Sequence, residues 1–359
     1  MGIYILAIAF VSALGLVISL LGKRSKSKDI IFLILAFTVL GLIMVLRDRS
    51  VGTDANSYCR VFEKIRDTTS ITRYSESAYL YALYNLLVSF IFKNPQWIIV
   101  FNGLIITVGI AIFIYKNSEN PVISTLYYVL FYWYFTSFNI SRQYIAVILI
   151  INAYSFVKEK RLIPAAIITI IAIFIHNTAI VGAIFLIFIY LKLNEKNMIR
   201  ILTLLCFVPF VFNYGINIFM SIFPRYKMYI IRLFVDKYEA QGRRIIITFI
   251  YMGVVAVALS LLKKKKNLFT KLEEEEMRRL ICIISIGIAI GIVSINSALV
   301  ARIEVYFSIF AIILIPSVIE RFGKFRYGVY YVSILVMLIP CYIQLEGNLS
   351  GVNPYKFFF

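Results

Sequence analysis

Charged residues are scarce in this sequence, and that shortage excludes most soluble folds. Only 15% of the 359 residues are charged, whereas 61% are hydrophobic. A soluble domain carries about 25% charged residues. Apolar runs of roughly 20 residues recur along the chain, and a helix of about that length crosses the hydrocarbon core of a bilayer. Because lipid cannot hydrogen-bond the backbone, such a chain has to form helices. We therefore predict an all-α, polytopic transmembrane helix bundle.

Cysteine and histidine are scarce as well, which argues against disulfide and metal chemistry. The 4 cysteines are scattered, and two of them, Cys206 and Cys282, lie inside apolar runs. No CxxC pair and no Cys/His spacing indicates a metal site. His176 is the only histidine in the chain. We therefore predict no metal site and no cofactor.

Acidic side chains are the third shortage: 18 Asp and Glu stand against 37 Lys and Arg, which gives a formal net charge of +19. In membrane proteins Lys and Arg gather in cytoplasmic loops, so their positions predict the topology. Twelve spans place all the strongly basic loops on one side. Topology and a basic outer face thus account for the charge, and we predict no nucleic-acid partner. The loops are 22–29, 158–161, 192–200, 263–279 and 320–326.

The twelve predicted spans belong to a single integral membrane domain, 1–359, with external loops at 47–96 and 215–245. The first run has no charged segment before it and no cleavage site after it, so we interpret it as a retained span and not a signal peptide. Both termini are then external. The spans are 3–21, 30–46, 97–115, 121–137, 140–157, 162–175, 178–191, 199–214, 246–262, 279–295, 303–320 and 327–342.

Two parts of this topology are unusual. The segment 78–92 is short and rich in tyrosine, and the twelve-span arrangement holds only if it lies in the interface or re-enters without crossing. The spans 162–175 and 178–191 are also shorter than normal and meet at FIHNTA. A short span has to thin the bilayer or end inside a protein cavity. We therefore expect the turn at His176 to lie below the outer surface, in a water-filled pocket.

The twelve-span arrangement gathers unusual polar residues on the outer face, beginning with LRDRSVGTDANSY at 46–58. Recognition of phosphate and pyrophosphate favours arginine, because its planar guanidinium stays charged and holds two oxygens at once. A charge at membrane depth is costly and is therefore a candidate for function. The candidates are Arg47, Arg49, Asp54, Tyr58, Arg142, His176, Arg243, Arg244, Arg302 and Glu304.

Each candidate also has an ordinary structural explanation. Arg142 is explained equally well as an interfacial anchor whose charged end reaches water. A histidine on an apolar hairpin, such as His176, is more often a packing residue. Asp54 after Gly-Thr fits a turn. Arg302 and Glu304 are two residues apart and do not face each other on a helix.

Five stretches taken together resemble a known family over about residues 40 to 310. They are the segment from Arg49 to Tyr58 with its Gly-Thr-Asp, ESAYL at 76–80, NISRQYIA at 139–146, FIHNTAI at 174–180 and ARIEVYF at 301–307. In this order they resemble the EpsG-like branch of the Wzy-type polysaccharide polymerases. The resemblance implies a GT-C-like glycosyltransferase architecture and an enzyme that works without a metal.

The resemblance also implies a reaction and a location. Such proteins polymerise oligosaccharide repeat units carried on undecaprenyl pyrophosphate, at the outer face of the bacterial cytoplasmic (inner) membrane. The growing chain leaves its lipid pyrophosphate and is transferred to a fresh lipid-linked unit. The expected partners are these lipid-linked oligosaccharides, the lipid bilayer and a chain-length regulator protein. The product is an O-antigen, a capsule or an exopolysaccharide.

This chemistry suggests roles for the candidates. Without a metal, cations have to stabilise the leaving pyrophosphate, and we assign this to Arg142, Arg302 and one of Arg243 or Arg244. A general base has to take the proton of the acceptor hydroxyl. His176 titrates in a suitable range, and Asp54 and Glu304 are the rival bases. Arg49 would orient Asp54 or bind the second lipid phosphate, and Arg47 and Tyr58 are further candidates for substrate binding.

Other functions remain open from the sequence. An O-antigen ligase uses the same donor with a lipid A-core acceptor. A flippase or transporter of lipid-linked oligosaccharides would place charges near the bilayer midplane and show inverted repeats, whereas the charges here cluster at one face. An accessory membrane subunit would not need an Arg/His/Asp set confined to the outer side.

Overall fold

The computed structural model describes every residue except 23, 190–192, 223–240, 265–267, 296 and 349. In this described part the secondary structure is helical, and the only strand-like pairing is one isolated antiparallel bridge between Arg47 and Phe357. Eight of the described helices are long and apolar enough to cross a membrane. The prediction of an all-α, polytopic membrane protein is therefore confirmed.

Several of the twelve predicted spans differ from the structure. The span 121–137 is broken into α6 (Pro121–Leu130) and α7 (Trp133–Asn139), because Tyr132 adopts a φ of 72° between them. The span 178–191 is a 3-10 helix, η1 (Asn177–Ile189), as far as it is described. Full candidate spans are thus fewer than predicted. The described residues also form three shorter apolar helices: Ala78–Ile91, Pro121–Leu130 and Leu162–Ile175.

The chain forms two compact units, which we describe separately. Unit 1 comprises Met1–Ala183 and Lys324–Phe359. Its other helices are α1 (Gly2–Leu20), α2 (Lys26–Val45), α3 (Ala55–Thr68), α4 (Thr72–Ile91), α5 (Gln96–Asn117), α8 (Ser141–Lys158), α9 (Leu162–Ile175) and α16 (Arg326–Gly347). Unit 2 comprises Ile184–Gly323. Its helices are α10 (Glu195–Ile222), α12 (Gln241–Lys264), α13 (Lys271–Ser294), α14 (Ala298–Ser308) and α15 (Ala311–Glu320).

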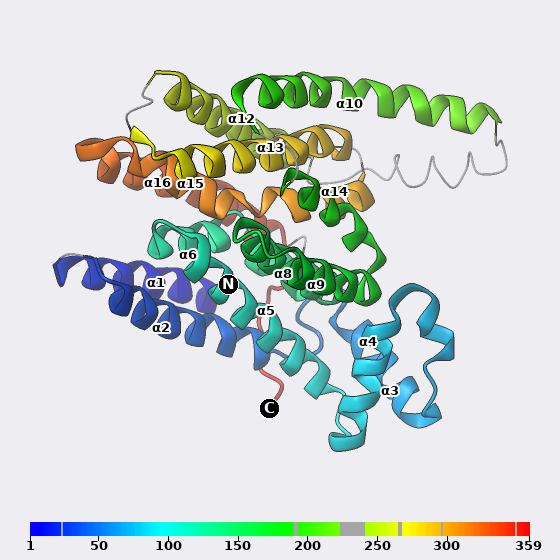
Figure 1. Cartoon of the computed structure of the whole chain (residues 1–359). Coiled ribbons are helices and arrows are strands. Elements are labelled where there is room, and N and C mark those ends of the chain that lie inside the picture. Colours follow the sequence, from blue (N-terminus) through cyan, green and yellow to red (C-terminus); the bar gives the residue numbers. More distant parts are fainter. Residues whose placement is uncertain (23, 190–192, 223–240, 265–267, 296, 349) are drawn as a thin grey trace. The chain divides into compact units, whose positions relative to one another are not determined.

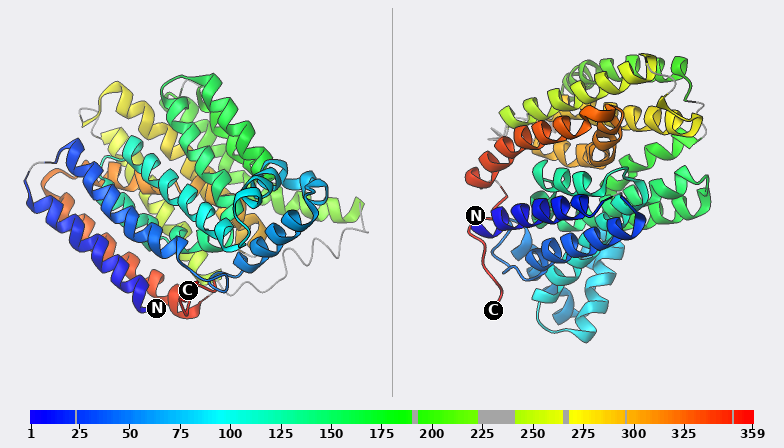
Figure 2. Two further views of the ribbon diagram at one scale, coloured as in Figure 1. Left: turned by 90° about the horizontal axis from the view of Figure 1, so that it is seen from below. Right: turned by 90° about the vertical axis from the view of Figure 1, so that its left-hand side faces the viewer.

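The directions of neighbouring helices show which of their ends lie together in unit 1. α1 and α2 lie side by side, as do α2 and α5 (Figures 1 and 2). A Cβ built on Gly103 would meet Val45, and one built on Gly41 would meet Thr107, so α2 and α5 run antiparallel. The Asn102 amide donates to Ser141 and the Asn117 amide to Ser155, which sets α5 and α8 parallel.

α5 and α8 also approach closely, because a Cβ on Gly109 would clash with the side chain of Ile148. A small residue at such a crossing lets two membrane helices pack backbone to backbone. Consequently α2 ends where α5 and α8 begin. We call this end of unit 1, marked by Val45, Gln96 and Ser141, the polar end.

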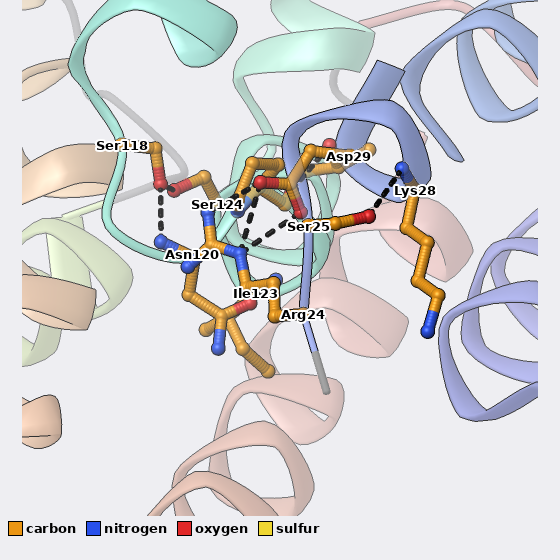
Figure 3. Close-up of polar contacts among 10 residues, drawn as sticks. Arg24, Ser25, Lys28, Asp29, Ser118, Asn120, Ile123 and Ser124 are labelled. Atoms are coloured by element: carbon orange, nitrogen blue, oxygen red, sulfur yellow. Dashed lines mark hydrogen bonds and ion pairs between the residues drawn. The ribbon is translucent and has the colours of Figure 1, made fainter. Parts of the chain in front are cut away.

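The opposite end of unit 1 carries basic loops. Ser25 caps α2 by accepting from the backbone of Lys28, and Asn120 caps α6 by accepting from Ile123 (Figure 3). Arg24 forms a bidentate pair with Asp29 at 2.8 to 3.0 Å. The loop 159–161 lies at this end too, since it follows the end of α8. The loops that the charge rule places on one side, 22–29 and 158–161, thus lie together, away from residues 46–58.

The range 47–96, predicted to be an external loop, contains two helices. α3 buries Ala55, Cys59, Phe62 and Ile65, a helical spacing, and the first three pack in one cluster with Val88, Ile98 and Ile99. In α4 the backbone is not helical at Ala78, where φ is −165° and ψ is 56°. The apolar part that follows, Ala78–Ile91, is about 20 Å long at 1.5 Å per residue, short of the roughly 30 Å needed to cross. That 78–92 does not fully cross stays a prediction.

Candidate functional site

The first candidate segment, 46–54, turns sharply at the polar end. The carboxylate of Asp48 accepts from the backbone N–H of Ser50 at 2.8 Å, and the Asp48 carbonyl accepts from Val51 at 2.9 Å. These bonds close a turn of the kind that Asp favours. Although partial burial opposes it, the hydrogen bonds from Ser50 lower the pKa of Asp48. The turn therefore contains a carboxylate and not a neutral acid at neutral pH.

Gly52 and Asn139 join two of the motifs found in the sequence. Gly52 has a φ of 103°, and a Cβ there would lie 3.0 Å from the carbonyl oxygen of Phe138. The next backbone N–H, of Thr53, donates to Asn139 Oδ1 at 2.8 Å. Only glycine combines this backbone conformation with such a close approach. The Gly-Thr-Asp segment is thus fastened to the break between α7 and α8, directly before Arg142.

Arg47 is completely buried, with 0% of its surface exposed. Its Nη2 donates to the Phe138 carbonyl at 3.1 Å, and its guanidinium lies 4.2 Å from the centre of the Phe138 ring. Its own carbonyl accepts from Gln96 Nε2 at 2.7 Å. Burial lowers the pKa of Arg47 to about 10, so the group is still charged at neutral pH. Substrate binding by Arg47 stays a prediction, and its described contacts are internal ones.

Arg142 begins α8 beside two tyrosines. Its backbone N–H donates to the hydroxyl of Tyr58 at 3.4 Å, and its guanidinium lies 5.9 Å from the ring centre of Tyr81. Tyr58 and Tyr81 contact each other edge to face, with ring centres 6.1 Å apart. The Tyr81 hydroxyl accepts from Asn102, which also donates to Ser141. The structure therefore confines Arg142, Tyr58 and Tyr81 to one cluster, which we call the Arg142 cluster.

The electrostatics of the Arg142 cluster favour a bound anion. Burial and the nearby charge of Asp54 raise the pKa of Tyr58, so this phenol stays neutral and retains its proton. Arg142 is partly exposed, and within the described residues no ion pair joins its guanidinium to a carboxylate. A partly exposed guanidinium is suited to a ligand phosphate.

Asp54 and Arg49 lie at the start of α3. Asp54 occupies the N-cap position, its carbonyl accepts from Ser57 and Tyr58, and its partly exposed side chain makes no capping bond. Arg49 Nη1 lies 3.7 Å from Glu63 Oε1, and both side chains are open to solvent. The structure thus pairs Arg49 with Glu63, whereas we expected it to orient Asp54. A role for Arg49 toward a lipid phosphate stays a prediction.

His176 forms the predicted turn. α9 ends at Ile175, the His176 backbone N–H donates to Ala172, and its carbonyl accepts from Ala179. α8 and α9 form an antiparallel pair joined by residues 159–161, so His176 lies at the polar end with Arg142. α9 has 14 residues and α8 has 18. At 1.5 Å per residue, His176 is recessed from the start of α8 by about 6 Å.

The remaining candidates belong to unit 2, where α12 and α13 lie side by side (Figure 1). Arg244 Nη1 donates to the carbonyl and hydroxyl of Ser294 at 2.8 and 3.0 Å and lies 3.5 Å from the Ser297 carbonyl. Arg244 thereby closes the C-terminal end of α13. Ser297 in turn caps α14, which carries Arg302 on its exposed side.

Glu304 and Arg243 complete the set in unit 2. Glu304 is partly buried, and a Cβ on Gly291 would come within 3.9 Å of its Cγ and 3.4 Å of Thr248 Oγ1. The side chain of Arg243 lies outside the described residues. In the part of the chain that the structure describes, no three His, Cys, Asp or Glu side chains gather closely enough to hold a metal ion.

Sequence reasoning missed several residues of the site. Tyr81, Asn102, Ser141 and Asn139 carry its internal hydrogen bonds. Asn139 and Ser141 lie within the NISRQYIA stretch, in which the charged Arg142 was the predicted site residue. Tyr81 and Asn102 meet because α4 and α5 pack together, and no local sequence pattern predicts that contact.

The comparison with protein families gives the decisive observation: the EpsG family matches residues 30–357. The chain belongs to the EpsG family. EpsG is a family of Wzy-like polymerases, and the resemblance found in the sequence is confirmed. No curated protein and no solved structure shows a match to the chain. This EpsG family protein is therefore a polysaccharide polymerase-like integral membrane protein.

Proposed function

We propose that this EpsG family protein is a membrane glycosyltransferase that polymerises oligosaccharide repeat units carried on undecaprenyl pyrophosphate. The reaction takes place at the outer face of the bacterial inner membrane. The observation that supports it best is the Arg142 cluster. A partly exposed arginine, a neutral tyrosine, a carboxylate and the only histidine share the end of unit 1 that lies away from the basic loops.

The chemistry follows from the leaving group. In the transfer, the bond between C1 of the donor sugar and the pyrophosphate oxygen breaks, and a bond from the acceptor hydroxyl oxygen to C1 forms. Negative charge develops on the departing pyrophosphate, and we assign its stabilisation to Arg142. The neutral Tyr58 hydroxyl beside Arg142 offers a further donor. Fixed donors aimed at a developing charge lower the barrier because they need no reorganisation.

The acceptor hydroxyl has to lose its proton as it attacks. His176 and Asp54 are the candidates for the base in unit 1, and Glu304 is the candidate in unit 2. Both unit 1 side chains are partly exposed at the polar end. The raised pKa of Tyr58 excludes its phenol as the base at neutral pH. The proton therefore passes to an imidazole or a carboxylate, which releases it to water after the transfer.

The test is complementation of a polymerase-null strain with single-residue variants at equal protein level in the membrane. We expect Arg142→Ala to reduce long-chain product by about 10²–10³-fold, the effect of losing one stabilising donor. Arg142→Lys should restore part of it, because the charge returns without the planar fork. Arg60→Ala, which removes an exposed arginine of α3, is the matched control and should have no effect.

The same assay separates the competing assignments. A polymerase defect leaves single repeat units attached to their acceptor, whereas a ligase defect leaves none attached. Long chains from both Arg142→Ala and His176→Ala at normal protein level would show that the site assignment is wrong. Loss of single units as well would favour the ligase, and lipid-linked units trapped on the cytoplasmic side would favour the flippase.

A further inference from the structure

The segment 350–358 runs alongside the segment 46–54. Asp48 N–H donates to the Lys356 carbonyl at 2.8 Å, and Phe358 N–H donates to the Leu46 carbonyl at 3.1 Å. These two bonds flank the antiparallel bridge between Arg47 and Phe357. Gly52 N–H donates to the Gly351 carbonyl at 2.8 Å. Two backbone N–H groups and one carbonyl of the first motif are thus satisfied by residues about 300 positions away in the chain.

Two tyrosines fasten the segment 350–358 to the helices of unit 1. The Tyr355 hydroxyl donates to the Ile43 carbonyl at 2.9 Å, at the end of α2. The Tyr4 hydroxyl donates to the Val352 carbonyl at 2.7 Å, from the start of α1. The two rings contact each other edge to face at 5.8 Å. Val352 and Tyr4 are fully buried, so this is a packed joint and not a loose contact.

We propose that the segment 350–358 is a fixed brace that holds residues 46–54 in place, which makes Tyr355, Arg47 and Asn139 positioning residues of the site. The role of the brace in polymerisation rests on the proposed function. Its mechanical basis does not, because it follows from the contacts alone. Arg47 anchors the segment 46–54 by its buried side chain, because its guanidinium contacts Phe138. Asn139 holds the far end, through Thr53.

If the segment 350–358 is a brace, the segment 46–54 should detach more often when one of their hydrogen-bonded contacts is removed. Val51 is fully buried, so a cysteine at this position reacts with a maleimide only when the segment 46–54 detaches. The probe is Val51→Cys in a Cys206→Ser background, which removes the exposed native thiol. Adding Tyr355→Phe should speed labelling by roughly two- to tenfold, the effect of one net hydrogen bond. Tyr342→Phe is the matched control, since Tyr342 is 51% exposed, and should leave the rate unchanged.

A cross-link then separates a fixed brace from a moving lid. A Cβ on Gly351 would lie 3.0 Å from Thr53 Cγ2, a separation suited to a disulfide between Thr53→Cys and Gly351→Cys. The left-handed φ of 60° at Gly351 strains any side chain there, so the Gly351→Cys single variant serves as the reference. We expect the oxidised pair to return the labelling of the Tyr355→Phe variant to the slow rate. Product length should be the same before and after reduction.

Two results would overturn the brace. One is equal labelling of Val51→Cys with and without Tyr355→Phe. The other is loss of polymerisation on oxidation of the disulfide with recovery on reduction, because a segment that has to move cannot be a fixed brace. Failure of the proposed function looks different. In that case the full-length protein makes no polymer in any variant, while the labelling rates still report whether the segment is held.

Discussion

Two turns between helices carry or precede motif arginines in this EpsG family protein, and they are held in different ways. In unit 1 the segment 46–54 donates three backbone hydrogen bonds, to the carbonyls of Lys356 and Gly351 and to the side-chain oxygen of Asn139. In unit 2 the turn between α13 and α14 is held by the side chain of Arg244 together with the cap at Ser297. The first turn is bonded to distant segments of the chain, whereas the described bonds of the second are its own backbone bond from Ser297 N–H to Ser294, the Ser297 cap and the guanidinium of Arg244.

The difference has an energetic consequence. Where several bonds hold a backbone, the loss of one leaves the others in place, and the turn still forms. Where one arginine donates to several oxygen atoms, its loss removes all of those bonds at once, although the Ser294 carbonyl keeps its bond from the Ser297 N–H. A lost hydrogen bond from a charged group costs about 1.5–3 kcal/mol. We therefore expect single substitutions at the turn of unit 1 to reduce stability and activity less than those at the turn of unit 2. The exception is a position where the backbone conformation itself requires glycine.

Gly52 is that exception and should show the largest effect. Gly52→Ala places a Cβ 3.0 Å from the Phe138 carbonyl at a φ of 103°. Backbone strain and the close contact together should destabilise the protein by about 3 kcal/mol and abolish long-chain product. Thermal unfolding in detergent and complementation measure the two effects.

Gly22 provides the control for Gly52. It has a similar φ of 96°, but a Cβ there would have no neighbour within 4 Å. Gly22→Ala should cost only the backbone preference, about 1 kcal/mol, and leave polymerisation intact. Equal losses from both variants would mean that the contact with Phe138 has no influence and that backbone strain explains everything.

Arg244→Ala should have the next largest effect. It removes the donor to Ser294 and Ser297, and we expect about a tenfold to hundredfold loss of activity, since hydrogen bonds from charged groups contribute about 1.5–3 kcal/mol. Arg244→Lys should recover little, because a single ammonium does not reproduce the geometry of the guanidinium. Arg200→Ala, at an exposed position of α10, is the control. Full activity of Arg244→Ala would remove the contrast between the two turns.

Much of this fold follows from hydropathy and charge. Apolar runs located the long helices, but α10 and α13 each extend eight residues beyond the predicted span at one end, and the predicted span 303–320 is divided between α14 and α15. The loops 22–29 and 158–161 lie at the same end of unit 1, as their lysines and arginines predict. The break at Tyr132 was not predictable, because it lies in an unbroken aromatic run without glycine or proline. The helices within 47–96 were missed because their charged residues conceal the spacing of Ala55, Cys59, Phe62 and Ile65.

The candidate site was predictable only in part. Charged residues at membrane depth are conspicuous in sequence, which is why Arg142 and Arg302 were found. Their supports are not conspicuous: Asn102, Tyr81 and Gly351 are ordinary residues that acquire a role through contacts between distant segments. A burial state is equally invisible, since Arg47 and Arg49 are two residues apart and yet one is buried and the other exposed.

Asn139 tests whether the loss of one hydrogen bond in unit 1 has a small effect when other bonds to the segment 46–54 remain. Asn139→Ala removes the acceptor of the Thr53 N–H but leaves the bonds to Gly351 and Lys356. We expect a loss of about 1–2 kcal/mol in stability and less than tenfold in activity, a smaller effect than that of Arg244→Ala. Asn139→Asp keeps an acceptor oxygen and should retain the bond. An Asn139→Ala defect larger than that of Arg244→Ala would reverse the proposed contrast.

The smallest effect concerns Cys59, on the helix into which the braced segment leads. Burial raises the pKa of the Cys59 thiol to about 11, and the thiolate is the reactive form. At pH 8 only about one thiol in a thousand is ionised, so maleimide labelling should be slow and should rise with pH toward that value. Ser57→Cys, an exposed position of the same helix, should label rapidly near pH 8. Similar rates for the two thiols would mean that α3 is loosely packed. The segment 46–54, which leads into α3, would then be held less firmly than its hydrogen bonds indicate.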